Sequence, residues 1–157
     1  PKGYVPALLL DDGQLLTENQ VVLQYVADQA PGSHLVPEFG SLARYRLMEW
    51  LAFISTELHK GFSPLWNRHL PEAAHQFARE QLARRFDYME KALSGEEWVG
   101  GDHFSIADAY LFTVLSWTAY HQIDLSPWPN LLAFQQRVAA RPAVNAALMA
   151  EGLTPPG

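Results

Sequence analysis

The chain has 157 residues, of which 48% are hydrophobic and 18% charged, a composition typical of a folded globular protein. Its net charge of −6 and the absence of a basic cluster argue against nucleic acid or an anionic membrane as a partner. No apolar run approaches the roughly 18 residues that a membrane span needs. The sequence contains no cysteine, and its six histidines show no pair with helical zinc-site spacing, so we expect no disulfide framework and no metal.

The beginning of the chain predicts a strand, a tight turn, a second strand and a helix. The first strand is expected at residues 8–10, and Asp12-Gly13 is expected to form a two-residue turn because glycine accepts positive φ. Thr17 is expected to cap a helix over residues 18–28. An isolated hairpin of two strands is only marginally stable in water, so we expect a larger sheet completed by residues before Pro1 or by a partner chain.

The rest of the chain is predicted to be helical. One helix should run from about residue 40 to residue 60 and end at Gly61. We expect further helices over residues 72–94, 105–120, 131–140 and 143–151. The sequence therefore predicts an α+β protein of two domains: a partial N-terminal unit (residues 1–30), a linker (31–40) and an all-helical domain (41–157).

The segment that begins at Ser105 carries the clearest folding signal. Its apolar residues point in every direction, which is typical of a central core helix. Ser105 and Asp108 have the spacing of a capping box, in which the serine hydroxyl accepts the Asp108 amide and the carboxylate accepts the Ser105 amide. We therefore interpret Asp108 as a folding signal and not as a catalytic acid.

Two short segments near the N-terminus could bind a ligand. Val5-Pro6 is either an ordinary proline at a strand entry or a cis peptide that leaves the Val5 backbone open to pair with an extended peptide. Glu18 and Asn19 lie at a helix start, where the amides and the dipole suit a ligand carboxylate while Glu18 accepts from an ammonium. The alternative is that Glu18 only complements the helix dipole.

His59 and Lys60 are the candidate catalytic pair. They could face the site and stabilise an anion such as a thiolate. The alternative is that both cations complement the negative end of a helix that stops at Gly61. The arginines of the next helix, Arg84 and Arg85, are interpreted as solvated.

The features in this order resemble the cytosolic glutathione S-transferase superfamily. The resemblance covers nearly the whole chain and rests on the segments Lys2 to Leu8, Leu15 to Asn19 and Gly100 to Asp108. Residues 56–62 and 104–115 resemble more narrowly the bacterial beta class. The resemblance implies the fold of that superfamily, in which part of a thioredoxin-like domain precedes an all-helical domain.

The resemblance also implies roles for individual residues. Val5 would pair with the cysteinyl backbone of glutathione ahead of a cis Pro6, and Glu18 with Asn19 would hold the γ-glutamyl end. His59 and Lys60 would approach the glutathione sulfur. Thr56 and Glu57 would belong to the same wall and serve the neighbouring subunit's site. The electrophile would lie over apolar side chains of the helical domain, and Phe53, Phe62 and Trp66 are expected to line it only because they lie near His59 in the sequence. Ala52 departs from some beta-class relatives, which carry Asn there.

The implied activity is conjugation of the glutathione thiol to hydrophobic electrophiles, a detoxification reaction of a cytoplasmic, bacterial homodimer. Tyr45, Met48, Glu49 and Ala52 would lie on the helix that joins the subunits. The residue that activates the thiol, a Cys, Ser or Tyr, is expected before Pro1, so we expect the chain alone to lack it. The alternatives are a glutathione-dependent thiol-disulfide reductase or peroxidase, and a non-catalytic binding module of the same fold.

Overall fold

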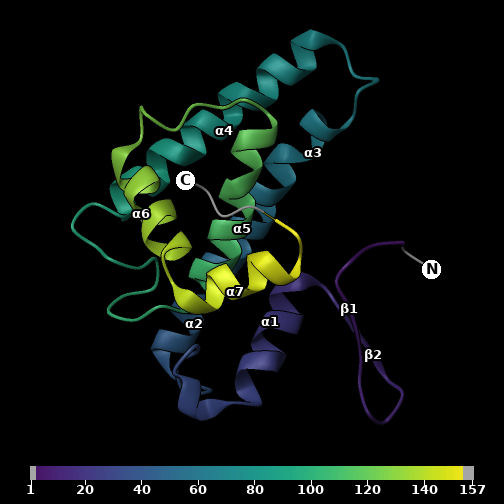
Figure 1. Cartoon of the computed structure of the whole chain (residues 1–157), viewed down its shortest axis with the longest axis vertical. Helices are drawn as coiled ribbons and strands as arrows, with labels where there is room; N and C mark the ends of the chain where they lie inside the picture. Colours follow the sequence, from purple (N-terminus) through teal and green to yellow (C-terminus); the bar gives the residue numbers. More distant parts are fainter. Residues whose placement is uncertain (1–2, 154–157) are drawn as a thin grey trace.

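A computed structural model describes residues 3–153, and the expectations that concern Lys2 or the outer ends of the two predicted domains lie outside the described residues. A short hairpin stands beside a body of packed helices (Figure 1). In chain order the elements are β1 (Ala7–Leu9), β2 (Leu15–Thr17), α1 (Asn19–Asp28), η1 (Pro31–Ser33), α2 (Leu42–Phe53), η2 (Ile54–His59), α3 (Lys60–Trp66), α4 (Glu72–Ala92), α5 (Ile106–Tyr120), α6 (Pro129–Ala139) and α7 (Pro142–Ala150).

The hairpin is confirmed, but its predicted two-residue turn is wrong. β1 and β2 pair antiparallel with Leu9 opposite Leu15. The Leu10 amide donates to the Gln14 carbonyl at 2.8 Å, and the Gly13 amide donates to the Leu10 carbonyl at 2.9 Å. The loop therefore has three residues, and only Gly13, at φ 83°, needs the left-handed backbone conformation.

The helix predicted to stop at Gly61 continues to Trp66 through a π-helical segment, η2. Lys60 follows this segment, and its backbone N–H donates to the Ser55 carbonyl five residues earlier. Gly61 serves packing and not termination: a Cβ atom there would lie 2.8 Å from Cδ2 of Leu82 on α4. The glycine thus lets α3 and α4 approach closely.

The helix α5 is the centre of the core, as its pattern predicts, and lies among the other helices in Figure 1. Its buried residues face several directions, and Leu111, Val114 and Leu115 are fully buried. The predicted stripe of α4 is also confirmed, with Leu82, Phe86, Met89 and the following Leu93 in the same core. Within residues 3–153, no helix is both long and apolar enough to cross a membrane.

The capping box at the start of α5 is confirmed. The Ser105 amide donates to the Asp108 carboxylate at 2.8 Å, and Ser105 Oγ accepts from the first turn, including the Ala107 amide at 3.2 Å. Asp108 is fully buried and also accepts from the Val99 amide at 2.8 Å. Burial raises the pKa of the Asp108 carboxyl, while the hydrogen bonds from Val99 and Ser105 oppose that shift. Asp108 therefore fixes the preceding loop as well as the helix.

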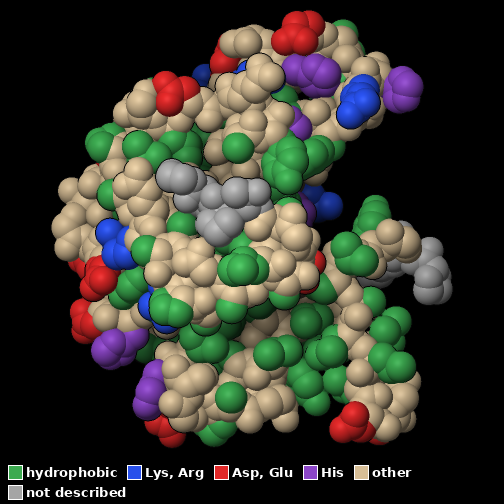
Figure 2. Space-filling view, viewed as in Figure 1, with side chains coloured by type: hydrophobic (Ala, Val, Ile, Leu, Met, Phe, Trp, Pro, Cys, Tyr) green, Lys and Arg blue, Asp and Glu red, His purple; other side chains and the backbone are tan. Residues whose placement is uncertain are grey.

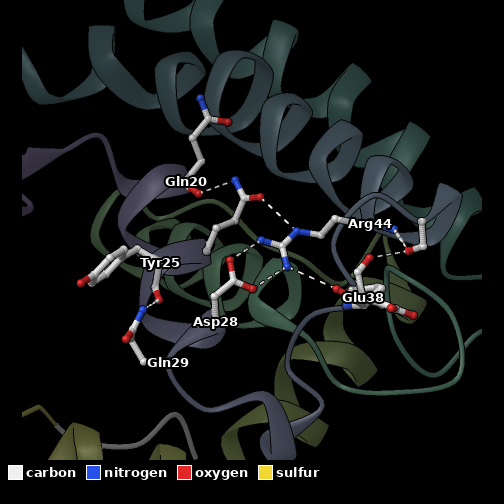
Figure 3. Close-up of polar contacts among 9 residues, drawn as sticks. Gln20, Tyr25, Asp28, Gln29, Glu38 and Arg44 are labelled. Atoms are coloured by element: carbon white, nitrogen blue, oxygen red, sulfur yellow. Dashed lines mark hydrogen bonds and ion pairs between the residues drawn. The ribbon is translucent and has the colours of Figure 1, made fainter.

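A buried arginine connects α1 to α2 (Figure 3). Arg44 is 3% exposed, and its guanidinium donates to both oxygens of Asp28 on α1, at 2.9 and 2.8 Å. It also donates to Gln24 Oε1 and to the Pro37 carbonyl, both at 3.3 Å. The Arg44 side chain thus connects α2 to α1 and to the segment that follows α1. The predicted linker at residues 31–40 stays a prediction.

We expect Asp108→Ala to lower the free energy of unfolding by roughly 3–5 kcal/mol, because it leaves the buried Val99 and Ser105 amides without acceptors. Urea denaturation followed by circular dichroism measures the change. Asp102→Ala, an exposed acid in the same loop, is the control and should shift the midpoint little. Equal midpoints for the two variants would contradict the role given to Asp108.

We expect Asp28→Asn to cost about 1–2 kcal/mol of stability at neutral pH, since Asp28 is 44% exposed and water partly screens its ion pair. Hydrogen bonding to Arg44 lowers the pKa of Asp28, so this stability is present above the ordinary value of 3.8 and is lost as pH falls below it. Denaturation at a series of pH values should show the two proteins converging in acid. A difference independent of pH, or one matched by the exposed control Asp11→Asn, would argue against the pair.

Candidate functional site

A cleft of about 1010 Å³ lies where the N-terminal segment faces the helical body. Figure 2 shows the molecule hollowed on the side where the hairpin stands away from the helices. Three parts of the chain line the cleft: the segment before and within the hairpin, the start of α1, and the η2–α3–α5 wall. The lining brings together six residues that the sequence predicts for the site: Val5, Pro6, Glu18, Asn19, His59 and Lys60.

The N-terminal wall combines an exposed backbone with a helix start. The Val5–Pro6 peptide is cis, as the resemblance implies, and Val5 is 91% exposed. The predicted cap is wrong: Thr17 belongs to β2, and Glu18 is the residue that precedes α1. Glu18 has φ 72°, an uncommon conformation for a residue with a side chain, and its carbonyl accepts the Val21 and Val22 amides at 2.9 Å. The backbone thereby holds Glu18 at the mouth of the helix.

The opposite wall owes its composition to the π-helical segment. Ser55 and His59 come from η2, and Lys60 and Ser63 follow on α3. A π-helical turn holds more residues than an α-helical turn, which changes the direction of the side chains that follow. His59 and Lys60 lie inside a continuous helical run, so the interpretation of them as C-terminal dipole partners is wrong.

Tyr110 is a cleft residue that the sequence did not single out. It projects from the core helix α5, is 5% exposed, and its hydroxyl lies 2.8 Å from Nδ1 of His59. Burial raises the pKa of Tyr110, hydrogen bonds with Ser55 and Asn19 oppose that shift, and the charge of Glu18 adds to it. The available signal was a tyrosine within the helix predicted to be central to the core, because a buried tyrosine hydroxyl usually finds a partner.

His59 and Lys60 differ in their surroundings. The ring of Trp117 packs edge-to-face on the His59 ring, with 4.8 Å between their centroids. Burial lowers the pKa of His59, and the neighbouring Lys60 charge lowers it further. Lys60 is exposed, and its ammonium lies 5.9 Å from the ring centroid of Tyr4 across the cleft. The wall thus offers an imidazole favoured in its neutral form beside an exposed cation.

Thr56 and Glu57 do not line this cleft. Thr56 is exposed, and its hydroxyl donates to the Ala52 carbonyl at 3.1 Å. Glu57 forms an ion pair of 2.8 Å with Arg85, so the interpretation of Arg85 as simply solvated is wrong. The assignment of Thr56 and Glu57 to a neighbouring subunit's site stays a prediction.

The predicted apolar lining is only partly possible. Phe62 is fully buried against Phe86 and Trp117, so it cannot form part of a ligand surface. Trp66 is 50% exposed and packs on Trp117 with 5.9 Å between ring centroids. Phe53 instead packs against Tyr88 and borders a separate cleft between α2 and α4. Trp66 does not line the cleft either, but of the three it is the one that keeps exposed apolar surface beside Trp117, the ring that packs on His59.

The residues described by the structure hold no group of three or more His, Cys, Asp or Glu side chains that could bind a metal ion. The cleft instead offers an exposed strand-like backbone, a carboxylate at a helix start, a neutral imidazole and an ammonium. That set can bind an extended molecule that carries both charges at one end and an anionic atom near the other.

Comparison with known proteins places this cleft in a family. Residues 53–142 match the family model described as the C-terminal domain of glutathione S-transferase. The chain is 50% identical over 153 residues to glutathione S-transferase GstA of Escherichia coli O157:H7, covering 98% of this chain and 76% of that protein.

Solved structures agree with that assignment. A glutathione transferase from Methylococcus capsulatus superposes with a TM-score of 0.95 at 60% identity, covering 98% of this chain and 76% of that one. Two further structures, each covering 98% of this chain and 77% of its own, superpose with TM-scores of 0.94. They are a sphingomonad glutathione S-transferase complexed with glutathione, at 46% identity, and a bacterial beta class enzyme from Sphingomonas chungbukensis, at 45%.

These similarities confirm the predicted fold class, in which a thioredoxin-like unit adjoins an all-helical domain. They extend over nearly the whole chain and include the segments on which the sequence resemblance rests. The chain belongs to the glutathione S-transferase family, and its resemblance to the bacterial beta class is confirmed.

Proposed function

We propose that the protein conjugates the thiol of glutathione to hydrophobic electrophiles, and that this reaction serves detoxification in the cytoplasm. The observation that carries the proposal is the composition of one cleft, whose two walls bring Glu18 and Asn19 opposite His59 and Lys60. The glutathione complex of the sphingomonad relative, at 46% identity, supports the same ligand class.

The N-terminal wall fits the amino-acid end of the tripeptide. The Glu18 carboxylate accepts from the α-ammonium group of the γ-glutamyl residue, while Asn19 and the N-terminus of α1 bind its α-carboxylate. The exposed Val5 backbone pairs with the cysteinyl residue as an added strand would. Together these contacts select an extended peptide with a free amino-acid group.

The helical wall fits the thiol end. The Lys60 ammonium stabilises the thiolate electrostatically, and the neutral imidazole of His59 supplies a hydrogen-bond donor. The thiol proton leaves to solvent, the sulfur forms a bond to the electrophilic carbon, and the leaving group departs with its electron pair. The half-exposed Trp66 provides apolar surface for the electrophile.

A homodimer is part of the proposal. Helix α2 exposes Leu42, Tyr45 and Met48, which are 71%, 57% and 41% exposed in the single chain. Burying such a row against a second copy would remove apolar surface from water, which favours association. The Phe53–Tyr88 cleft borders the same helix.

We expect Glu18→Gln to weaken glutathione binding by about 10- to 100-fold, the loss for a charged hydrogen bond of roughly 1.5–3 kcal/mol. Glutamine is chosen because it keeps the side-chain shape at a residue with positive φ. Isothermal titration calorimetry measures the affinity. Glu96→Gln, an exposed acid after α4, is the matched control.

The ligand supplies a second control for Glu18. A glutathione analogue that lacks the α-amino group should bind the parent protein and Glu18→Gln equally, because it cannot form the ammonium contact. If Glu18→Gln weakens both ligands by the same factor, the proposed clamp on the ammonium group is wrong.

We expect Lys60→Met to raise the thiol pKa of bound glutathione by about one unit, since a nearby cation favours the thiolate. The ultraviolet absorbance of the thiolate, followed against pH at saturating glutathione, measures it. Lys91→Met at the end of α4 removes the same charge from an exposed position outside the cleft. An unchanged thiol pKa in Lys60→Met would remove Lys60 from the thiol site.

A further inference from the structure

We propose that Tyr110 is a positioning residue that holds His59 in a single neutral tautomer, with the proton on Nε2, and thereby connects the two ends of the cleft. The inference about the tautomer rests on the hydrogen bond between Tyr110 and His59 and on the burial of the phenol. Its consequence for the thiol rests on the proposed function of the cleft.

The position of the His59 ring is fixed by two residues of α5. The Tyr110 hydroxyl lies 2.8 Å from Nδ1, and the Trp117 ring packs edge-to-face at 4.8 Å. Tyr110 and Trp117 lie on the central core helix, where Tyr110 is 5% exposed. The His59 ring is therefore oriented by contacts from a closely packed core helix.

The direction of the hydrogen bond follows from the burial of the phenol. Tyr110 is 5% exposed, and its hydroxyl keeps its single hydrogen at neutral pH because burial raises the pKa of the phenol. A buried tyrosine hydroxyl needs an acceptor for that hydrogen. Nδ1 of His59, at 2.8 Å, supplies the acceptor.

A neutral imidazole that accepts at Nδ1 carries its proton at Nε2. His59 then presents an N–H donor to the cleft and does not act as the base that removes the thiol proton. The charged and titratable groups around this pair are Lys60 at the start of α3, Glu18 ahead of α1 and Tyr110 itself. Lys60 supplies a positive charge to the cleft, and the Nε2–H group of His59 supplies a directional hydrogen bond.

The same phenol connects the two predicted binding functions. Asn19 belongs to the wall proposed for the γ-glutamyl group, and His59 belongs to the wall proposed for the sulfur. Tyr110 lines the cleft together with both residues, and its hydroxyl is hydrogen-bonded to His59. One side chain of the core helix therefore borders the amino-acid end of the site and positions its thiol end.

The test is the protonation of the His59 ring nitrogens, read from long-range proton–nitrogen NMR spectra of ¹⁵N-labelled protein. In the parent protein we expect Nδ1 to show the shift of an acceptor nitrogen and Nε2 that of a protonated one. Tyr110→Phe should mix the two tautomers and raise the His59 pKa toward its ordinary value, because the bond that favours the neutral form is lost. Tyr88→Phe, a half-exposed tyrosine on α4, is the control.

Two results would overturn the inference: a parent protein with its proton on Nδ1, which needs no variant to detect, or a folded Tyr110→Phe protein with unchanged tautomer and pKa. The ligand arm compares glutathione with S-methylglutathione, which has no thiolate. We expect only glutathione to shift the Nε2 signal, and equal shifts with both would refute the contact to sulfur. If neither ligand binds the parent protein while the tautomer is as expected, the proposed function fails and the positioning by Tyr110 stands.

Discussion

The cleft depends on an ion pair between a buried arginine and a partly exposed aspartate, which lies outside the cleft. Arg44 binds both oxygens of Asp28 and also the Pro37 carbonyl, so one guanidinium sets the position of α1 against α2. A planar group that donates in two directions restricts rotation as well as distance. Since Glu18 and Asn19 stand at the other end of α1, the geometry of the ligand wall is set at the far end of a ten-residue helix.

Helix α5 is the second element that sets the geometry of the cleft. Asp108 fixes the start of this helix, and Tyr110, two residues further along, forms the hydrogen bond with His59 in the cleft. The Ile106 amide also donates to the Leu35 carbonyl at 3.1 Å, which attaches the segment after α1 to the same helix end. A folding signal and a functional side chain therefore share one rigid element, so the stability of the core and the precision of the site are linked.

The sequence predicted what depends on local patterns. The capping box of Ser105 and Asp108 and the all-round apolar pattern of α5 are encoded within one segment, and both are confirmed. The end of the helix near Gly61 was mispredicted because the reason for that glycine is a Leu82 side chain on another helix. Tyr110 was missed for a related cause: its partner His59 is 51 residues away, and no local pattern records such a contact.

The π-helical segment has a consequence for how such a wall is formed. Each residue added to a helix rotates everything after it by about 100°. Before Ile54–His59 the helix buries Leu47 and Leu51 in the core. After this segment, Lys60 and Ser63 line the cleft. Leu51 before the segment and Phe62 after it are both buried, so the helix contributes to the cleft without leaving the core. The binding wall is therefore formed by a change of register within one helical run and not by a separate element.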